Sequence, residues 1–321
     1  MQDIKYGRKR SGIVKELNKK IEDWLSTIDD QDTQQAAKKD VILMGGAIAS
    51  MLMGDAVNDF DVYFKTKETT IKVAKYYVEK FNKANNLEVK EGVNEYAPFV
   101  KTEELVNIKG ITENRVCIHI KSAGVAGENP EKYEYFEQEG SGDQEEFINS
   151  TLNKDAQEDT KNRYRPVFLS QNAISLTNKF QIVIRFFGDP EKIFESYDFV
   201  HAMNYFDYDK QELKLNPEAL EAMLSRTLIY KGSLYPLASI WRMKKFINRG
   251  WRISAGQQLK IMWQISEINL KDINTVREQL TGVDAAYLFQ LIRALESMDQ
   301  SDFEQVDSTY IGVLIDKIFQ E

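Results

Sequence analysis

The chain has 321 residues, of which 42% are hydrophobic, so it is long enough for a large core and favours two packed units over one. Its single cysteine excludes an internal disulfide framework and a cysteine-based zinc site. The net charge of −8 excludes a protein that coats nucleic acid through a broad positive field, although a local basic groove remains compatible with it.

The N-terminal residues are polar and lack the apolar stretch of a signal peptide, and no window has the length and hydropathy of a membrane span. We therefore expect a cytoplasmic protein in a reducing compartment, without a membrane partner. Residues 242–252 carry arginines and lysines but no acid, so they are the best candidate for a local basic surface.

Apolar spacing predicts the elements of the N-terminal part. Residues 12–26 have a helical stripe, and 41–44 form a short apolar strand. A Gly45-Gly46 turn and a helix over 47–53 follow. Residues 59–64 then alternate as a half-buried strand, with Asp59, Asp61 and Tyr63 on one face.

The later elements follow the same rules. We predict a helix over 69–85 and a strand over 115–120 that continues the sheet. Residues 124–163 are polar and aperiodic, and we interpret them as a mobile acidic insertion. Strands are predicted over 167–169, 173–176 and 180–186, the last two joined as a hairpin at 177–178, and the pattern after residue 190 is helical to the end of the chain.

The pair Asp59 and Asp61 carries the clearest chemistry. Two carboxylates two residues apart on a strand point the same way, so they can share a hard cation such as Mg²⁺ or Mn²⁺. The glycines Gly45 and Gly46 let backbone amides approach a phosphate chain, and the following helix adds its positive N-terminal end. Ser50 offers a hydroxyl one turn inside that helix.

The order of these motifs resembles the polymerase-β-like nucleotidyltransferase superfamily. Its pattern is a hydrophobic residue and Gly-Gly or Gly-Ser, then a spacer, then Asp-hydrophobic-Asp-hydrophobic. Here twelve residues separate Gly45-Gly46 from Asp59-Phe60-Asp61-Val62. The resemblance implies nucleotide transfer assisted by two metal ions, with Asp59 and Asp61 as catalytic metal ligands and an NTP, ATP being our first choice, as the substrate.

A narrower resemblance is to tRNA nucleotidyltransferases and bacterial poly(A) polymerases. Residues 45–54 follow the frame Gly-Gly-x-Val-Arg-Asp-x-Leu-Leu-Gly, residues 198–205 look like Asp-Phe-Thr-x-Asn-Ala-x-x-Tyr, and 236–251 are similar to a later helical motif. This resemblance implies that Asp198 lies near the ribose and base. It also implies that Arg242, Lys245 and Arg249 line the nucleotide cleft, and that an RNA or tRNA 3′ end is one acceptor.

The chain departs from that class at several positions. Ala49-Ser50 replace an Arg-Asp pair, Ser196-Tyr197 replace two arginines, and the charged template that selects C and A is missing from 233–239. The strand 180–186 offers Gln181 where a third carboxylate is common. His119 is an alternative base, although a lone strand histidine more often has a structural role.

Together these observations predict an α+β chain with an N-terminal helix (1–29), a small mixed-sheet nucleotidyltransferase head (30–205) and a helical domain (206–321). We expect the cleft between the head and the helical domain. The predicted function is metal-dependent transfer of an NMP from an NTP to a hydroxyl of RNA, protein or a small molecule. The alternative is a catalytically weakened nucleotide-binding or structural protein of the same fold.

Overall fold

The computed structural model describes residues 7–87, 97–107, 110–120, 163–280, 301 and 313, and the backbone of 124–129 and 132–135. Its helices are α1 (Arg10–Leu25), α2 (Gln31–Asp40), α3 (Gly46–Met53), α4 (Lys67–Ala84), α6 (Pro190–Phe194), the short 3₁₀ helix η1 (Val200–Ala202), α7 (Pro217–Ser225), α8 (Pro236–Asn248), α9 (Ala255–Ser266) and α10 (Ile273–Leu280). Its strands are β1 (Val41–Met44), β2 (Phe60–Phe64), β3 (Phe99–Val106), β4 (Thr112–His119), β5 (Gly124–Asn129), β6 (Lys132–Tyr135), β7 (Pro166–Ser170), β8 (Ala173–Leu176), β9 (Phe180–Phe187), β10 (Tyr205–Asp207) and β11 (Glu212–Lys214).

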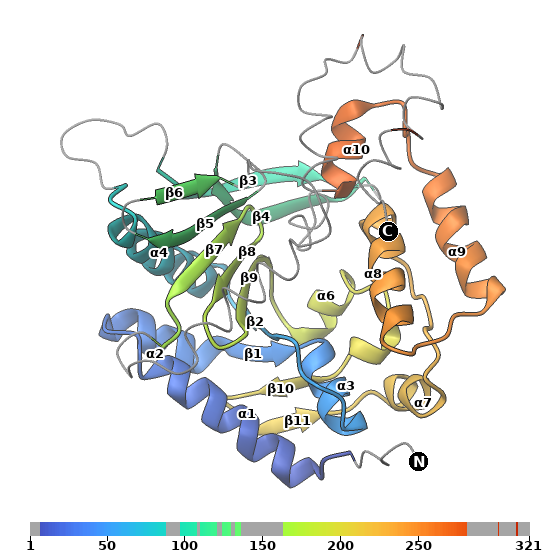
Figure 1. Cartoon of the computed structure of the whole chain (residues 1–321), viewed down its shortest axis with the longest axis horizontal. Coiled ribbons are helices and arrows are strands. Elements are labelled where there is room, and N and C mark those ends of the chain that lie inside the picture. Colours follow the sequence, from blue (N-terminus) through green and yellow to red (C-terminus); the bar gives the residue numbers. More distant parts are fainter. Residues whose placement is uncertain are drawn as a thin grey trace.

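A mixed sheet organises the fold, as the sequence predicts. The strand order is β11-β10-β1-β2-β9-β8-β7-β5-β6 (Figure 1). The strands β1 and β2 pair antiparallel, whereas β2 and β9 pair parallel, with Asp61 opposite Gln181. The predicted hairpin of β8 and β9 is confirmed, and its turn places Asn178 and Lys179 in the left-handed region. The chain is thus an α+β protein with a mixed sheet.

Helices α1 and α4 cover one face of this sheet. Their apolar stripes are fully buried against Val62 and Ile182 of the central strands. The indole nitrogen of Trp24 on α1 donates to the Tyr77 hydroxyl on α4 at 2.8 Å, which joins the two helices inside the core. The opposite face of β2 and β9 carries Asp61 and the other polar side chains, so strand alternation separates the core from the site.

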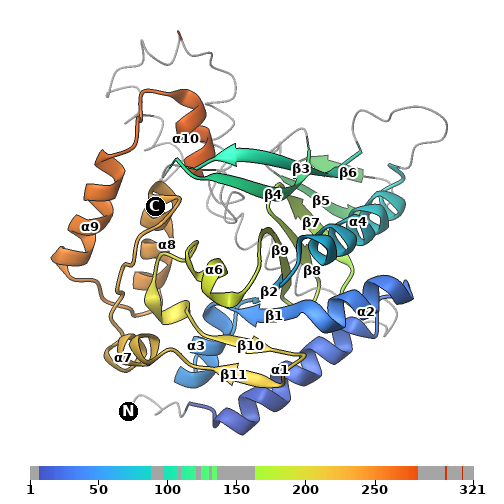
Figure 2. The same cartoon turned by 180° about the vertical axis from the view of Figure 1, so that it is seen from behind.

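The helices α7 to α10 lie together at one side of the molecule in both views (Figures 1 and 2). Ala49 of α3 belongs to the same apolar cluster as Phe199, Leu228 and Trp251, so the helical part shares a core with the head. Within the described part of the chain, no helix combines the length and the apolar character needed to cross a bilayer.

Several predicted features need correction. The strand predicted over 115–120 does not continue the main sheet, because β4 pairs with β3 in a separate two-stranded sheet. The segment predicted as an irregular insertion begins with β5 and β6, and β5 pairs with both β7 and β6; its remainder, 136–162, lies outside the described residues.

The main sheet also contains strands in the region from residue 205 onward. The short strands β10 and β11 add an edge to the sheet beside β1, in a region predicted to be helical. Three-residue strands are too short to show a period of two, so backbone pairing rather than side-chain pattern defines them. The helix α2 was not predicted; its first turn is capped by Asp30, whose carboxylate accepts from the Thr33 amide at 2.8 Å. The predicted helical packing of 287–295 lies outside the described residues.

Candidate active site

A cavity between the sheet and α8 brings most of the predicted site residues together, and we call it the cleft. The head lines it with Gly45, Gly46, Asp59, Asp61, Tyr63, Gln181, Arg185 and Phe186, and the following segments add Ser196, Tyr197, Asp198, Phe199, His201, Ala202, Tyr235, Arg242, Lys245, Phe246 and Arg249. Residues that are far apart in the sequence therefore line a single cavity. Its lining includes residues of the predicted head (30–205) and of the predicted helical domain (206–321).

The turn after β1 requires glycine at its first position. Gly45 has φ +92° and ψ −158°, a backbone conformation that is essentially restricted to glycine. A Cβ atom added there would lie 3.0 Å from Oδ2 of Asp61. Gly46 begins α3, and a Cβ atom at this position would meet no atom within 4 Å. The turn therefore leaves room for the Asp61 carboxylate and places the start of α3 at the cleft.

Asp59 and Asp61 both line the cleft; Asp61 lies on β2, whereas Asp59 immediately precedes the strand, which begins one residue later than predicted. The neighbouring strand β9 places Gln181 opposite Asp61, so an amide takes the position where a third acid would stand. The described residues contain no group of three or more acids, histidines or cysteines arranged for a metal ion. His119 is exposed on β4, where its ring contacts Phe99, and it does not line the cleft.

The donor set of this site suits a hard divalent cation. Carboxylate oxygens are the ligands that Mg²⁺ and Mn²⁺ prefer, and Mg²⁺ commonly needs only one or two carboxylates when a substrate phosphate and water complete its shell. A Cβ atom at residue 45 would crowd Oδ2 of Asp61, so glycine leaves space beside that oxygen. The chemistry of the two carboxylates therefore fits a hard divalent cation.

One face of α8 supplies positive charge to the cleft. Arg242, Lys245 and Arg249 line it, and their spacing of three and four residues places them on the same side of the helix. Nε of Arg242 donates to Oδ2 of Asp198 at 2.6 Å, and both side chains are mostly buried. The structure thus gives Asp198 a specific partner: it orients the Arg242 guanidinium.

This contact predicts an effect on nucleotide affinity. Asp198→Asn should weaken ATP binding about tenfold, because the loss of a charge-assisted hydrogen bond lets the Arg242 side chain leave its position. Binding can be measured by isothermal titration. Asp55→Asn is the matched control, since it breaks the Asp55–Arg226 ion pair, neither member of which lines the cleft. An equal loss of affinity in both variants would contradict this role for Asp198.

His201 lies at the cleft and packs against aromatic side chains. Its ring centroid is 4.4 Å from that of Phe246 and 4.2 Å from that of Trp251. Only 1% of the residue is exposed, and neither buried ring nitrogen has a hydrogen-bond partner among the described residues. Burial, with the nearby Arg249 charge, lowers the pKa of His201 to about 3, so the imidazole is neutral in the folded chain.

The buried histidine makes the stability depend on pH. Its folded pKa of about 3 lies below its ordinary value of 6.5, so the unfolded chain binds a proton between these values and the folded chain does not. The free energy of unfolding should therefore fall as the pH drops below 6.5, by about 2 kcal/mol at pH 5 from this group. Urea titrations at pH 5 and at a pH above 6.5 test this. His201→Leu should lose less stability than the wild type between the two conditions. An identical loss would show that His201 is not the source of the pH dependence.

Tyr197 also lines the cleft. Its hydroxyl donates to the Tyr63 hydroxyl at 3.1 Å, which links the segment before η1 to β2. Burial raises the pKa of Tyr197 well above its ordinary value, and the neighbouring Tyr63 and Asp61 raise it further. The phenol therefore stays protonated and available as a donor.

Arg185 and Tyr235 are among the lining residues that the sequence did not indicate as part of the site. Arg185 lies four residues after Gln181 on β9, so period-two alternation would have placed it on the cleft face. Tyr235, just before α8, has no such signal, and it reaches the cleft only through the packing of the helical part. The guanidinium of Arg185 lies 4.5 Å from the centroid of the Tyr235 ring.

Ser50 is the predicted nucleotide-binding residue that the structure does not place on the cleft lining, and its role stays a prediction. Ser50 lies on α3 one turn beyond Gly46 and is not among the residues that line the cleft. One helical turn corresponds to roughly 5.4 Å along the axis, which separates this hydroxyl from the N-terminal end of the helix. The predicted nucleotide-binding residues that do line the cleft are Gly45, Gly46, Asp198, Arg242, Lys245 and Arg249.

Comparisons with known proteins add a family. A Bacillus phage SPbetaL7 protein, "Gabija anti-defense 2", is 25% identical over 148 residues, which cover 44% of this chain and 36% of the phage protein. The chain thus spans little more than a third of that relative.

Two solved structures are also similar. A tRNA-processing enzyme with CTP shows 11% identity and a TM-score of 0.33 over 83% of this chain and 58% of the enzyme. The Thermotoga maritima CCA-adding enzyme complexed with tRNA shows 10% identity and a TM-score of 0.36 over 94% and 70%.

The family comparison covers most of the fold described above. A model of the "Gabija anti-defense 2 family protein" matches residues 15–226, which include the turn after β1, Asp59, Asp61 and Asp198. Since this match extends over more than half of the sequence, the chain belongs to the Gabija anti-defense 2 family.

Proposed function

We propose that the protein is a metal-dependent nucleotidyltransferase, which moves an NMP from an NTP to a hydroxyl acceptor and releases pyrophosphate. One observation carries this proposal: the Gly45-Gly46 turn, the Asp59–Asp61 pair and the cationic face of α8 line a single cleft. A phosphate-binding turn, a metal-binding pair and a source of positive charge are the groups that in-line attack at a phosphorus atom requires.

The lining residues support a division of roles. Backbone amides at the start of α3 would bind the phosphate chain. Asp59 and Asp61 would hold Mg²⁺ or Mn²⁺, which on binding would neutralise phosphate charge and align the reacting groups. Arg242, Lys245 and Arg249 would bind the nucleotide or a phosphate of the acceptor. Gln181 can hydrogen-bond but cannot accept a proton, so it cannot act as the general base.

The substrates are part of the proposal. ATP is the preferred NTP, and the resemblance of residues 198–205 and 236–251 to tRNA nucleotidyltransferases favours an RNA 3′ end as the acceptor. A hydroxyl of a protein or a small molecule is the other possibility. The name of the family further supports an anti-defence role against Gabija, and we expect that role to be performed in the cytoplasm.

A thermal-shift experiment tests the binding half of this proposal. The wild-type chain should be stabilised by an NTP with Mg²⁺ more than by either alone, because Asp59 and Asp61 would hold the cation and its charge would favour binding of the phosphates. Asp59→Asn should lose this synergy, whereas the control Asp55→Asn should keep it. Absence of a Mg²⁺-dependent effect with all four NTPs would contradict the proposal.

A second candidate is a non-catalytic nucleotide-binding or structural protein of the same fold. The observation that favours it is the amide of Gln181 opposite Asp61, where a third acid would otherwise complete the site. This candidate predicts Mg²⁺-dependent NTP binding without turnover. Release of pyrophosphate by the wild type, and not by Asp59→Asn, would exclude it.

A further inference from the structure

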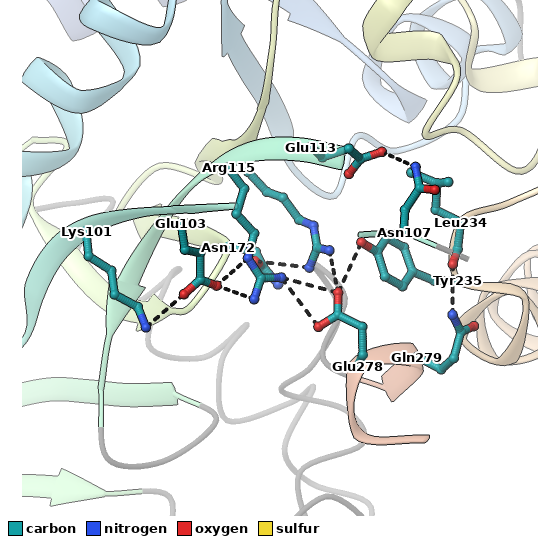
Figure 3. Close-up of polar contacts among 11 residues, drawn as sticks. Lys101, Glu103, Asn107, Glu113, Arg115, Asn172, Leu234, Tyr235, Glu278 and Gln279 are labelled. Atoms are coloured by element: carbon teal, nitrogen blue, oxygen red, sulfur yellow. Dashed lines mark hydrogen bonds and ion pairs between the residues drawn. The ribbon is translucent and has the colours of Figure 1, made fainter. Parts of the chain in front are cut away.

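One carboxylate of the C-terminal helices contacts two arginines of the head. Oε1 of Glu278, on α10, accepts from Nη2 of Arg185 at 2.6 Å and from Nη1 of Arg115 at 3.2 Å. The Tyr235 hydroxyl donates to the same oxygen at 3.4 Å. Figure 3 shows dashed lines that join the Glu278 carboxylate to the Arg115 guanidinium and to the Tyr235 hydroxyl. Three donors from β4, β9 and the segment before α8 therefore converge on one anionic group.

Arg185 depends on this carboxylate. Its side chain is 1% exposed and lines the cleft, and its buried Nε has no hydrogen-bond partner within the part of the chain that the structure describes. Among the described residues, Glu278 is the acid that pairs with Arg185, whereas Arg115 also pairs with Glu103. Burial lowers the pKa of Arg185 to about 10, although the negative charge of Glu278 raises this pKa and so offsets part of the effect. The guanidinium is thus a buried cation that requires an anion.

Glu278 is the removable member of the cluster. Its side chain is 27% exposed, in contrast to Arg185. Its helix is attached through the neighbouring Gln279, whose Nε2 donates to the Leu234 carbonyl at 2.9 Å. The arginines lie on strands of two sheets, whereas Glu278 lies on a helix of eight residues at the edge of the molecule. Displacement of Glu278 would leave both sheets intact.

We propose that Arg115, Arg185 and Tyr235 form a phosphate-binding site at the end of the cleft, which Glu278 occupies as an internal anion until a phosphate group of a ligand displaces it. Arginine forks and a phenol match the several acceptor oxygens of a phosphate. The site lies four residues along β9 from Gln181, roughly 13 Å, so it is separate from the metal-binding carboxylates. This inference goes beyond the proposed transfer reaction and adds a second anion site to the same cleft.

The test uses the full chain with inorganic pyrophosphate, without metal ions and without NTP. Pyrophosphate should increase hydrogen exchange of the α10 amides, 273–280, in the wild type. Glu278→Gln should show increased exchange before pyrophosphate is added. It should also bind pyrophosphate about tenfold more tightly in isothermal titration, because the internal competitor has lost its charge. The result does not depend on whether the chain transfers a nucleotide.

Two further variants make the result specific. Glu103→Gln removes the same charge from the same cluster but leaves Glu278 in place, so it should change pyrophosphate affinity far less. Arg185→Gln combined with Glu278→Gln removes both members of the buried pair, which avoids an uncompensated charge, and it should abolish the gain in affinity. Two results would overturn the proposal. One is an equal gain in pyrophosphate affinity in Glu103→Gln. The other is faster α10 exchange in Glu278→Gln without any gain in pyrophosphate affinity.

The phosphate group has two possible sources, the NTP and a phosphorylated acceptor. Parallel exchange measurements with ATP and with a 5′-phosphorylated dinucleotide separate them. The ligand that increases α10 exchange at the lower concentration identifies the source. Failure of both ligands to change α10 exchange would overturn the proposal.

Discussion

Asp61→Asn should abolish nucleotidyl transfer while leaving the fold intact. The substitution keeps the shape of the side chain but removes the charge that a divalent cation needs, and metal stabilisation of the reacting phosphates contributes several kcal/mol. We therefore expect a loss of at least about a thousandfold in the rate of pyrophosphate release. The measurement is a coupled pyrophosphate assay with each NTP and Mg²⁺.

The control for Asp61→Asn is Asp55→Asn. It makes the same chemical change in the segment between α3 and β2, at a residue that pairs with Arg226 and does not line the cleft. It should retain the wild-type rate. Melting temperatures of both variants should stay close to that of the wild type. A rate in Asp61→Asn within a few-fold of the wild type would show that this carboxylate does not serve the reaction.

Gly45→Ala should have the second large effect, on stability and on the site together. Its positive φ is unfavourable for alanine, and its Cβ would lie 3.0 Å from the Asp61 carboxylate. Backbone strain of this kind costs about 1–3 kcal/mol. We expect a matching decrease in the free energy of unfolding in urea, together with loss of Mg²⁺-dependent ATP binding, since the Asp61 side chain must move.

Gly46→Ala is the matched control for the neighbouring glycine. Its Cβ would enter open space, and alanine is a better helix former than glycine at the start of α3. Its stability should equal or slightly exceed that of the wild type. If the two alanine variants unfold at the same urea concentration, the glycine requirement at residue 45 is wrong.

The acid pair and the turn have a local sequence signal: Asp59 and Asp61 are two residues apart, and Gly45-Gly46 interrupts an apolar run. Their expected placement at one cleft, like that of Lys245 and Arg249, comes from the resemblance to nucleotidyltransferases. Ser50 could not be placed correctly from the motif alone, because one turn of helix moves its hydroxyl away from the cleft.

The rest of the site depends on contacts between distant parts of the chain. Arg185 and Glu278 are 93 residues apart, and neither lies in a motif. The short strands β5, β6, β10 and β11 pair through backbone groups, so their side chains carry little signal of the pairing. The separate sheet of β3 and β4 arises because β4 pairs with β3 along its length, which an alternating pattern in a single strand cannot specify.

A transfer assay with labelled nucleotide tests the central claim most directly. Each NTP, labelled at the α-phosphate or at the γ-phosphate, is incubated with the chain, Mg²⁺ and a mixed extract of RNA and protein. We predict that the α-label enters an RNA or protein acceptor with the wild type and not with Asp61→Asn, while the γ-label leaves as pyrophosphate. Equal labelling with both proteins, transfer of the γ-label, or no pyrophosphate release from any NTP would contradict the assignment as a nucleotidyltransferase.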